Sequence, residues 1–465
     1  MVAPDVEVAV RQNGVARDGG RLTRILPVLS LNSHQAEENI QNRWAREIQQ
    51  DTAEARALLE AAEALRTSDI PVAFPTETVY GLGADATRSA AVRGIYKAKQ
   101  RPSDNPLIVH VSSRDQLEKL LRPPTSSQPS ISADPPNTAN TKKSSLIPAI
   151  YEPLIARFWP GPLTILVPNP PHSPLAPEVT SSLPTFGVRI PSSPLARLLI
   201  HLADRPLAAP SANASTKPSP TTAQHVYTDL RGRIDIILDG GPCGVGVEST
   251  VVDGLSNPPA ILRPGGIGIE EIRACPGWED VRIAYKDGAS QDKAAPRAPG
   301  MKYRHYSPKA KVVLFESGRD PTFAAERILQ DLPESLSETG SPWTVGVVRT
   351  KTWPLGLSLT VKEDSRNGID QVSQSAHSSS SSAKPLSSIT RLQVTDGSHR
   401  TFEVLDLSLG SDTHSIARGL FSALRSLDEK DVSVIYVEGI SDTEGDLAAA
   451  IMNRLRKAAE EEVKT

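Results

Sequence analysis

The chain has 465 residues, a formal net charge of −3 and two cysteines, and 38% of its residues are hydrophobic. This length is enough for two or three domains with cores of their own, and the near balance of charge argues against a protein that wraps nucleic acid over its whole surface. Cys243 and Cys275 alone can form neither a disulfide framework nor a zinc cluster.

The sequence favours a cytoplasmic protein that does not enter a membrane. No run of 18 apolar residues is present, so no transmembrane helix is expected. The first residues also lack the apolar core of a signal peptide. Four arginines among residues 11–24 suggest a mitochondrial transit segment, whereas three acidic residues among residues 5–18 argue against one. A mitochondrial pool therefore stays open.

Helices and strands alternate through the first part of the chain. Residues 1–35 show no sustained period and are expected to be mostly irregular, whereas Glu37–Arg66 has leucines and alanines at helical spacing and predicts a helix that could break near Asp51. Further helices are expected at Ser89–Lys99, Ser113–Leu121, Pro148–Phe158, Pro194–His201 and Thr221–Leu230. Strands are expected at Val72–Phe74, Pro106–Val111, Leu163–Val167, Val188–Ile190, Leu207–Ala209, Ile234–Leu238, Ser249–Val252 and Ala260–Leu262. This mixture indicates an α/β domain.

A second alternation begins at Ala310. Strands are expected at Val312–Phe315, Val345–Val348, Val404–Leu407 and Val434–Val437, and helices at Thr322–Leu332, Ser415–Ser426 and Leu447–Ala459. The pattern predicts a smaller C-terminal Rossmann-like parallel α/β domain. No GxGxxG sequence occurs in it, so no dinucleotide site is expected there.

Composition suggests the domain limits. We expect a catalytic domain at residues 36–276, a charged, polar linker at 277–309 and the C-terminal domain at 310–465. Residues 122–145 and 363–388 contain almost no large apolar side chains and cannot bury enough surface to offset the entropy lost on ordering. Both are therefore predicted to be disordered insertions.

The stretch Pro71–Ala86 (PVAFPTETVYGLGADA) carries the first candidate site. The apolar run Val72–Phe74 is followed by the polar cluster Thr76–Thr78 and then by Gly81 and Gly83. A buried strand that opens into a polar, tight-turning loop is how open α/β sheets present a site. The glycines would let the backbone turn or approach a ligand closely. A strand and a turn with surface threonines is the alternative.

Eight separate stretches, in this order, resemble the YrdC-like threonylcarbamoyl-AMP synthase family. They are Thr76–Gly83; Lys99–Arg101 with Asn105 and His110; Trp159–Thr164; Thr185–Pro191; Ala209–Asn213 with Pro218–Pro220; Gly246–Val251; Leu262–Gly266; and Ala298–Tyr306. Each is weak alone, but the ordered set spans roughly residues 50–310 and is specific; the C-terminal domain matches more loosely, best at residues 447–458.

The resemblance implies a fold and a reaction. The first domain would be a YrdC-like twisted, open mixed sheet with helices. The enzyme would join L-threonine, bicarbonate and ATP to give L-threonylcarbamoyl-AMP and pyrophosphate, for threonylcarbamoyladenosine at position 37 of tRNA. The product would pass to a tRNA threonylcarbamoyl transferase complex. The linker would fold over the nucleotide as a lid through its aromatic residues, which could otherwise simply pack at the domain interface.

The resemblance also implies two sets of contacts. The residues that would contact ATP are Arg101, Asn105, Thr185, Ser211, Ser219, Arg263 and Tyr303. The residues that would contact L-threonine are Thr78, His110, Arg189, Ser249 and Ala209, the last through its backbone. Taken singly, His110 could equally be a hydrogen-bonded histidine at a strand end. Arg189, between two apolar residues, needs a partner, and a ligand carboxylate is one candidate.

The residue types suit a nucleotide. Lys99 and Arg101 could converge on one anion if their segment is extended, since a guanidinium binds two phosphate oxygens and an ammonium adds a point charge. A solvated helix end is the alternative for this pair. Ser211 and Asn213 supply neutral donors and acceptors. We predict that Lys99 and Arg101 stabilise the leaving pyrophosphate and that Ser211 and Asn213 orient the nucleotide. No Walker A sequence is present, and Mg²⁺ is expected to arrive on the ATP phosphates.

Two other functions compete with this reading. One is a double-stranded RNA-binding module without catalysis, which the net charge and the lack of an aromatic and basic stripe oppose. Direct RNA contact by an enzyme is left open. The other is the synthesis of a different carbamoyl-adenylate, as in hydrogenase-maturation carbamoyltransferases, which carry zinc-finger cysteines that this chain lacks.

Overall fold

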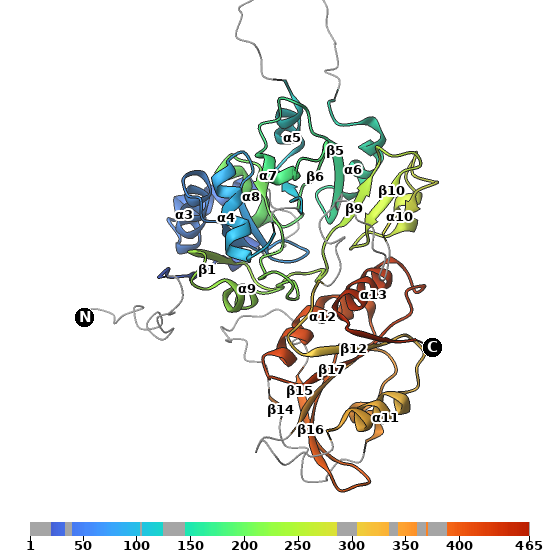
Figure 1. The fold of residues 1–465 in the computed structure, drawn as a ribbon. Coiled ribbons are helices and arrows are strands. Elements are labelled where there is room, and N and C mark those ends of the chain that lie inside the picture. The colour runs from blue at the N-terminus through green and yellow to red at the C-terminus, as the bar shows by residue number, and fades with distance from the viewer. Residues whose placement is uncertain are drawn as a thin grey trace, which may run out of the picture.

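The computed structural model describes residues 20–32, 40–102, 105–123, 145–285, 305–333, 343–359, 369–370 and 388–464. These residues form two α/β units, which lie one above the other in Figure 1. The expectation of a mixed-sheet first unit and a smaller, parallel-rich second unit is confirmed.

The described part of the first unit is built on an eleven-stranded sheet with the order β1-β8-β2-β3-β7-β4-β6-β5-β9-β10-β11. Its strands are β1 Arg24–Pro27, β2 Val72–Phe74, β3 Gly81–Asp85, β4 Val109–His110, β5 Leu163–Pro168, β6 Thr185–Arg189, β7 Leu207–Ala208, β8 Ile236–Asp239, β9 Thr250–Asp253, β10 Ala260–Arg263 and β11 Arg282–Ile283. Strand β4 pairs with β6 in parallel and with β7 antiparallel, so the sheet is mixed at its centre.

Helices cover this sheet. They are α1 Leu29–Asn32, α2 Ile40–Gln49, α3 Ala53–Thr67, α4 Ser89–Lys99, α5 Arg114–Leu121, α6 Glu152–Phe158, α7 Pro177–Thr180, α8 Pro194–Ala203, α9 Ala223–Leu230 and α10 Ile269–Arg273, with a 3₁₀ turn at Ala149–Tyr151. Asp51, at φ 46°, separates α2 from α3 and confirms the predicted break. Thr52 then caps α3, because its hydroxyl accepts a hydrogen bond from the amide of Ala55 at 3.1 Å. The face of α3 that carries Leu58 and Leu65 is buried with α8 against the sheet.

Three local expectations for this unit are wrong. Strand β1 and helix α1 lie within the supposedly irregular residues 1–35, because β1 completes the sheet edge beside β8. Gly81–Gly83 forms strand β3 rather than a turn; a Cβ atom on Gly83 would lie 2.6 Å from the ring of Phe74, so glycine serves close packing there. The strand expected at Pro106–Val111 shortens to β4.

The second unit has a seven-stranded sheet in the order β14-β15-β16-β13-β17-β12-β18. Its elements are β12 Lys311–Phe315, α11 Pro321–Asp331, β13 Thr344–Arg349, a 3₁₀ turn at Leu355–Ser358, β14 Ile369–Asp370, β15 Ile389–Thr395, β16 Thr401–Ser408, α12 Thr413–Asp428, β17 Val434–Glu438, α13 Asp446–Ala458 and β18 Glu461–Val463. Strands β16, β13, β17, β12 and β18, which are neighbours in this order, run parallel, as predicted. Strands β14 and β15 add an antiparallel edge that the sequence prediction lacks.

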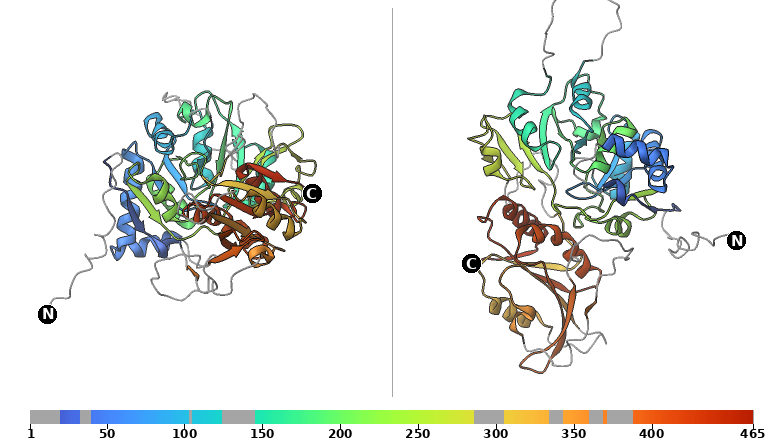
Figure 2. Two further views of the ribbon diagram at one scale, coloured as in Figure 1. Left: turned by 60° about the horizontal axis from the view of Figure 1, so that its bottom comes forward. Right: turned by 180° about the vertical axis from the view of Figure 1, so that it is seen from behind.

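Helices α12 and α13 lie on the face of this sheet that meets the first unit, and α11 lies on the other face (Figures 1 and 2). Val79 and Val247 of the first unit belong to the same apolar cluster as α12 and α13. Arg425 of α12 forms a buried ion pair with Asp229 of the first unit at 2.7 Å. The units are therefore docked by both apolar and ionic contacts.

Several predictions fall outside the described residues. Residues 286–304 of the predicted linker, with Tyr303, are among them, as are 124–144 and nearly all of 363–388 from the predicted insertions. Among the helices that the structure does describe, none combines the length and apolar character needed to span a bilayer.

Candidate active site

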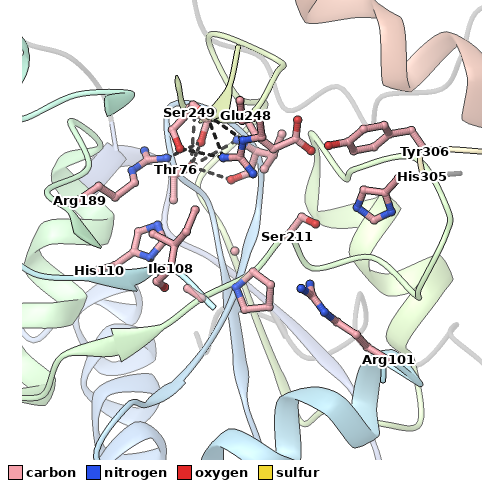
Figure 3. A pocket seen from close by; sticks show the side chains of 16 residues that line it. Thr76, Arg101, Ile108, His110, Arg189, Ser211, Glu248, Ser249, His305 and Tyr306 are labelled. Carbon is pink, nitrogen blue, oxygen red and sulfur yellow. Dashed lines mark hydrogen bonds between the residues drawn. The ribbon is translucent and has the colours of Figure 1, made fainter. Parts of the chain in front are cut away.

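A cavity opens where several strands of the first sheet end (Figure 3). Five predicted residues line it, each from a separate chain segment: Thr78, His110, Arg189, Ala209 and Ser249. The strand pairing explains part of this convergence, since His110 and Arg189 are register partners at the carboxyl ends of the parallel strands β4 and β6. These are the five residues for which the resemblance implies contact with threonine.

The turn after β2 presents Thr78 to the cavity. The hydroxyl of Thr76 donates to the carbonyl of Val79 at 2.7 Å and accepts from the amide of Thr78 at 3.2 Å. The amides of Val245 and Gly246 donate to the carbonyls of Glu77 and Thr78 from outside the turn. The polar cluster is therefore an ordered, buried turn and not a surface loop.

Arg189 has a protein partner. Its Nη2 atom lies 2.5 Å from Glu77 Oε1, with 4% and 8% of the two side chains exposed, and its Nη1 atom donates to the hydroxyl of Thr78 at 3.1 Å. Burial lowers the pKa of Arg189, and the Glu77 carboxylate opposes that effect. Arg189 Nε and Glu77 Oε2 are buried without a hydrogen-bond partner in the described part of the chain. Arg189 thus keeps donor capacity for a further anion while Glu77 balances its charge.

His110 is held in its neutral form. Burial, and then the nearby charge of Arg189, lower its pKa to about 3. Its Nδ1 atom lies 3.2 Å from the carbonyl of Ile108. Because a carbonyl can only accept, Nδ1 carries the proton and Nε2 is left as an acceptor.

Lys99 and Arg101 separate instead of converging. Lys99 is the last residue of α4 and Gln100 is left-handed at φ 53°, so the segment is not extended. The buried Lys99 Nζ atom donates to the carbonyl of Asn213 at 2.6 Å, to its side-chain oxygen at 3.3 Å and to the carbonyl of Ser211. Burial, followed by the charge of Arg101, lowers the pKa of Lys99, yet three oxygen acceptors match the three donors of an ammonium. Only Arg101 of this pair lines the cavity.

Asn213 braces the loop that carries Ser211. Its side-chain oxygen accepts from the Ser211 hydroxyl at 2.6 Å, and its side-chain nitrogen donates to the carbonyls of Ala214 and Lys217. Ser211 itself lines the cavity, whereas Asn213 does not. Lys99 and Asn213 therefore act on the shape of the loop rather than on the space inside the cavity.

The other residues implied for ATP fall in different places. Arg263 lines the cavity and donates to the hydroxyl of Ser249 at 3.0 Å. Asn105 lies beside Arg101, outside the lining, with its side-chain oxygen buried and without a partner in the described part of the chain. Thr185 begins β6, four residues and about 13 Å of extended strand from the cavity end at Arg189, so the structure does not bring it to the cavity. Tyr303 lies outside the described residues.

Glu248 is a cavity residue that sequence analysis left without a role. It accepts a hydrogen bond from the buried hydroxyl of Ser219 at 2.5 Å, which places Ser219 behind Glu248 and not in the lining. Burial would raise the pKa of Glu248, but Arg454, Arg263 and Ser219 together lower it to about 2. Glu77 and Glu248 both lie inside motifs that the sequence had singled out. A charged residue within a mostly buried stretch was the feature that could have identified each as a functional residue.

His305 and Tyr306 close one side of the cavity (Figure 3). Tyr306 is buried and its hydroxyl is hydrogen-bonded to Glu248, while burial above all raises its pKa. Burial likewise lowers the pKa of His305 to about 3. Two neutral aromatic residues of the predicted lid segment therefore exclude water from the Glu248 side.

The cavity has two chemically distinct ends. Around Arg189 it offers one cation, hydroxyls and a neutral histidine, which suits a small molecule with a carboxylate and a hydroxyl. Around Arg101 and Ser211 it offers a second cation and a hydroxyl, which suits phosphate groups. Arg263 lines the cavity beside Ser249, close enough to Arg189 for the two charges to interact. No cluster of three or more potential metal ligands occurs among the described residues.

Two family models match the chain. The model described as "Telomere recombination" matches residues 64–265, and the model described as "Threonylcarbamoyl-AMP synthase, C-terminal domain" matches residues 267–460. Together they span both structural units.

Relatives that match over most of their length are named threonylcarbamoyl-AMP synthase. The chain is 47% identical over 414 residues to the threonylcarbamoyl-AMP synthase of Schizosaccharomyces pombe, covering 87% of this chain and 89% of that protein. It is 40% identical to the Bacillus subtilis protein of that name, over 86% and 92% of the two chains. A solved structure of Pyrococcus abyssi Sua5 in complex with L-threonine is 38% identical, with a TM-score of 0.63 over 88% of this chain and 96% of that one.

Proposed function

The chain belongs to the threonylcarbamoyl-AMP synthase family, and we propose how its cavity is divided between L-threonine and ATP. The enzyme joins L-threonine, bicarbonate and ATP into L-threonylcarbamoyl-adenylate and pyrophosphate, and so supplies the activated intermediate for threonylcarbamoyladenosine in tRNA. The roles of individual residues are the proposal.

L-Threonine binds at the Arg189 end. Its carboxylate takes the donors that Arg189 retains beside the Glu77 pair, because a guanidinium binds a carboxylate well. The acceptor nitrogen of His110 and the hydroxyl of Thr78 suit the substrate hydroxyl. A buried site that hydrogen-bonds a hydroxyl strongly rejects analogues that lack one. The Pyrococcus abyssi relative was solved in complex with L-threonine, which supports L-threonine as the ligand.

ATP binds at the Arg101 end. Arg101 and Arg263 supply positive charge for the phosphates, and Ser211 supplies a neutral hydrogen bond. The unpartnered side-chain oxygen of Asn105, beside Arg101, remains available to a nucleotide hydroxyl or amino group. Mg²⁺ enters as part of the MgATP substrate, because this ion binds readily to substrate phosphates.

Positioning and charge carry the chemistry. The threonine amine combines with bicarbonate and releases water to give N-carboxythreonine, whose carboxylate attacks the α-phosphorus as pyrophosphate leaves. Arg101 and Arg263 stabilise the charge on the leaving group. Lys99 and Asn213 hold Ser211 in place through the loop. His305 and Tyr306 exclude water that would hydrolyse the intermediates.

The convergence of all five threonine residues in one cavity with Arg101, Ser211 and Arg263 carries this proposal. Its test is pyrophosphate release from ATP and bicarbonate, with L-threonine compared against L-serine and L-valine. L-Valine keeps the branched shape and lacks the hydroxyl, so we expect release to fall about a hundredfold or more with it. Equal release with L-threonine and L-valine contradicts the assignment of His110 and Thr78.

The product needs an acceptor. Because an acyl-adenylate hydrolyses readily, it passes to a tRNA threonylcarbamoyl transferase complex, and direct contact of this chain with tRNA remains a prediction. We place the reaction in the cytosol, with a mitochondrial pool open. The free thiols of the buried Cys243 and Cys275 fit either reducing compartment.

A further inference from the structure

One arginine of the second unit reaches the wall of the cavity. Arg454 lies on α13, and its side chain is fully buried. Its Nε atom donates to Glu248 Oε2 at 3.1 Å, and its Nη1 atom donates to the carbonyl of Pro264 at 2.6 Å. Ser249 follows Glu248 and Arg263 precedes Pro264, so Arg454 joins the two segments that carry these cavity residues.

Glu248 depends on this contact. One of its oxygens accepts from Ser219 and the other from Arg454, and its carboxylate also meets the hydroxyl of Tyr306. A buried carboxylate that loses its cation is strongly unfavourable. Arg263 is another cation whose charge acts on Glu248. Without Arg454, the carboxylate would therefore draw Arg263 away from a nucleotide.

The surrounding backbone leaves little room to compensate. A Cβ atom on Gly265 would lie 2.2 Å from the amide of Thr250 and 2.4 Å from the carbonyl of Glu248. Gly246 has φ 84°, and a Cβ atom there would lie 2.4 Å from the carbonyl of Ala417 on α12. The segments around Glu248 and Arg263 thus press against each other and against the second unit.

We propose that Arg454 is a positioning residue for the reaction. By holding Glu248 and the Pro264 backbone, it fixes the nucleotide end of the cavity, so the C-terminal unit completes the ATP site from behind its wall. This inference rests on the proposed assignment of Arg263 to ATP. It gives the C-terminal unit a specific part in ATP binding, carried by one ion pair across the interface.

The test compares two arginines of α13. Arg454→Met removes the contact with Glu248, whereas Arg456→Met removes ion pairs with Glu316 and Asp442 that lie within the second unit. We expect Arg454→Met to raise the KM for ATP about tenfold or more, with kcat and the Kd for L-threonine without nucleotide changed by less than about threefold. Arg456→Met should leave the KM for ATP within about twofold. Arg454→Lys should recover part of the loss.

A second comparison tests whether Arg454 acts through Glu248. Glu248→Gln removes the buried charge, so Arg454→Met combined with Glu248→Gln should raise the KM for ATP by less than the product of the two single effects. An additive double variant overturns the proposal, as does an unchanged KM for ATP in Arg454→Met. If Arg454→Met does not fold, Arg454→Lys and Glu248→Gln decide the matter by the same KM for ATP.

Failure of this inference is distinguishable from failure of the site assignment. If Arg101→Ala raises the KM for ATP and Arg454→Met does not, the assignment stands and the inference is wrong. If Arg101→Ala and Arg263→Lys both leave that KM unchanged, the ATP assignment itself is wrong. Equal losses of ATP binding, L-threonine binding and thermal stability in Arg454→Met, without recovery in Arg454→Lys, would reduce Arg454 to a structural tie.

Discussion

The two ends of the cavity are built by different means. At the end proposed for L-threonine, His110 and Arg189 are fixed by the register of β4 and β6 inside one sheet. At the end proposed for ATP, Arg101 follows a helix, Glu248 lies in a loop and Tyr306 belongs to the segment between the units. A sheet sets side-chain positions through its own hydrogen bonds, whereas loops need support from elsewhere. The second unit supplies that support.

This difference predicts that damage to the threonine end affects folding as well as binding. Arg189→Ala leaves Glu77 as a buried, unpaired carboxylate, and we expect a loss of about 3–5 kcal/mol in the free energy of unfolding together with loss of L-threonine binding. Denaturant unfolding and calorimetric titration measure the two effects. Arg189→Met combined with Glu77→Gln should recover stability but not binding. Recovery of neither would contradict the role given to the pair.

Removal of an arginine at the nucleotide end should leave the free energy of unfolding unchanged. Arg101→Ala removes a charge that lines the cavity, and we expect the KM for ATP to rise about 10- to 100-fold with no change in L-threonine binding. Steady-state pyrophosphate release measures it. Arg93→Ala is the control, since Arg93 lies on α4 and is 62% exposed in an ion pair with Glu178. Similar KM values in the two variants would argue against a phosphate role for Arg101.

Each end of the cavity contains one histidine, so the stability of the fold in acid tests both ends. The pKa values of His110 and His305 are lowered from 6.5 to about 3, so between these values the unfolded chain binds more protons and stability falls as the pH falls. Each histidine should lower the free energy of unfolding by about 2 kcal/mol at pH 5 relative to pH 7. His110→Asn and His305→Asn should each flatten the dependence of unfolding free energy on pH. A change for His110→Asn alone would mean that the lid segment is open in solution.

The smallest effect concerns the lid. Tyr306→Phe removes only the hydrogen bond to Glu248 and keeps the ring, which packs against Phe421 of α12 at a centroid distance of 5.2 Å. We expect ATP binding to weaken by about 1 kcal/mol, which corresponds to about a fivefold rise in the KM for ATP, with no change in the affinity for L-threonine. A loss as large as that of Arg101→Ala would indicate direct contact of the hydroxyl with substrate.

Much of the fold follows from local pattern. The amphipathic helices α3, α4 and α12 and the buried parallel strands of the second unit lie close to their predicted ranges, because period and apolarity act within single segments. Strand β1 could not be found this way. It is a short sheet edge whose existence depends on β8, more than 200 residues later in the chain.

Contacts between residues far apart in the sequence were also not predictable in the candidate site. The need of Arg189 for a partner was readable from its apolar neighbours, but the identity of Glu77, 112 residues away, was not. The spacing of Lys99 and Arg101 allowed convergence if the segment was extended, but Lys99 ends α4 and left-handed Gln100 turns the chain after it. Lys99 therefore donates to the backbone of the Ser211 loop, while Arg101 lines the cavity. The contact between Arg454 and Glu248 arises only when two units dock. Local sequence carries the chemistry of each residue, and the tertiary fold decides which residues meet.

We propose that one cavity has a threonine end and a nucleotide end that can be damaged separately. The most direct test titrates L-threonine and a non-hydrolysable ATP analogue, each alone, into Arg189→Lys and Arg101→Ala by calorimetry. We expect Arg189→Lys to weaken the binding of L-threonine about tenfold or more and to spare the binding of the analogue, while Arg101→Ala does the reverse. Equal weakening of both ligands by either substitution would contradict it.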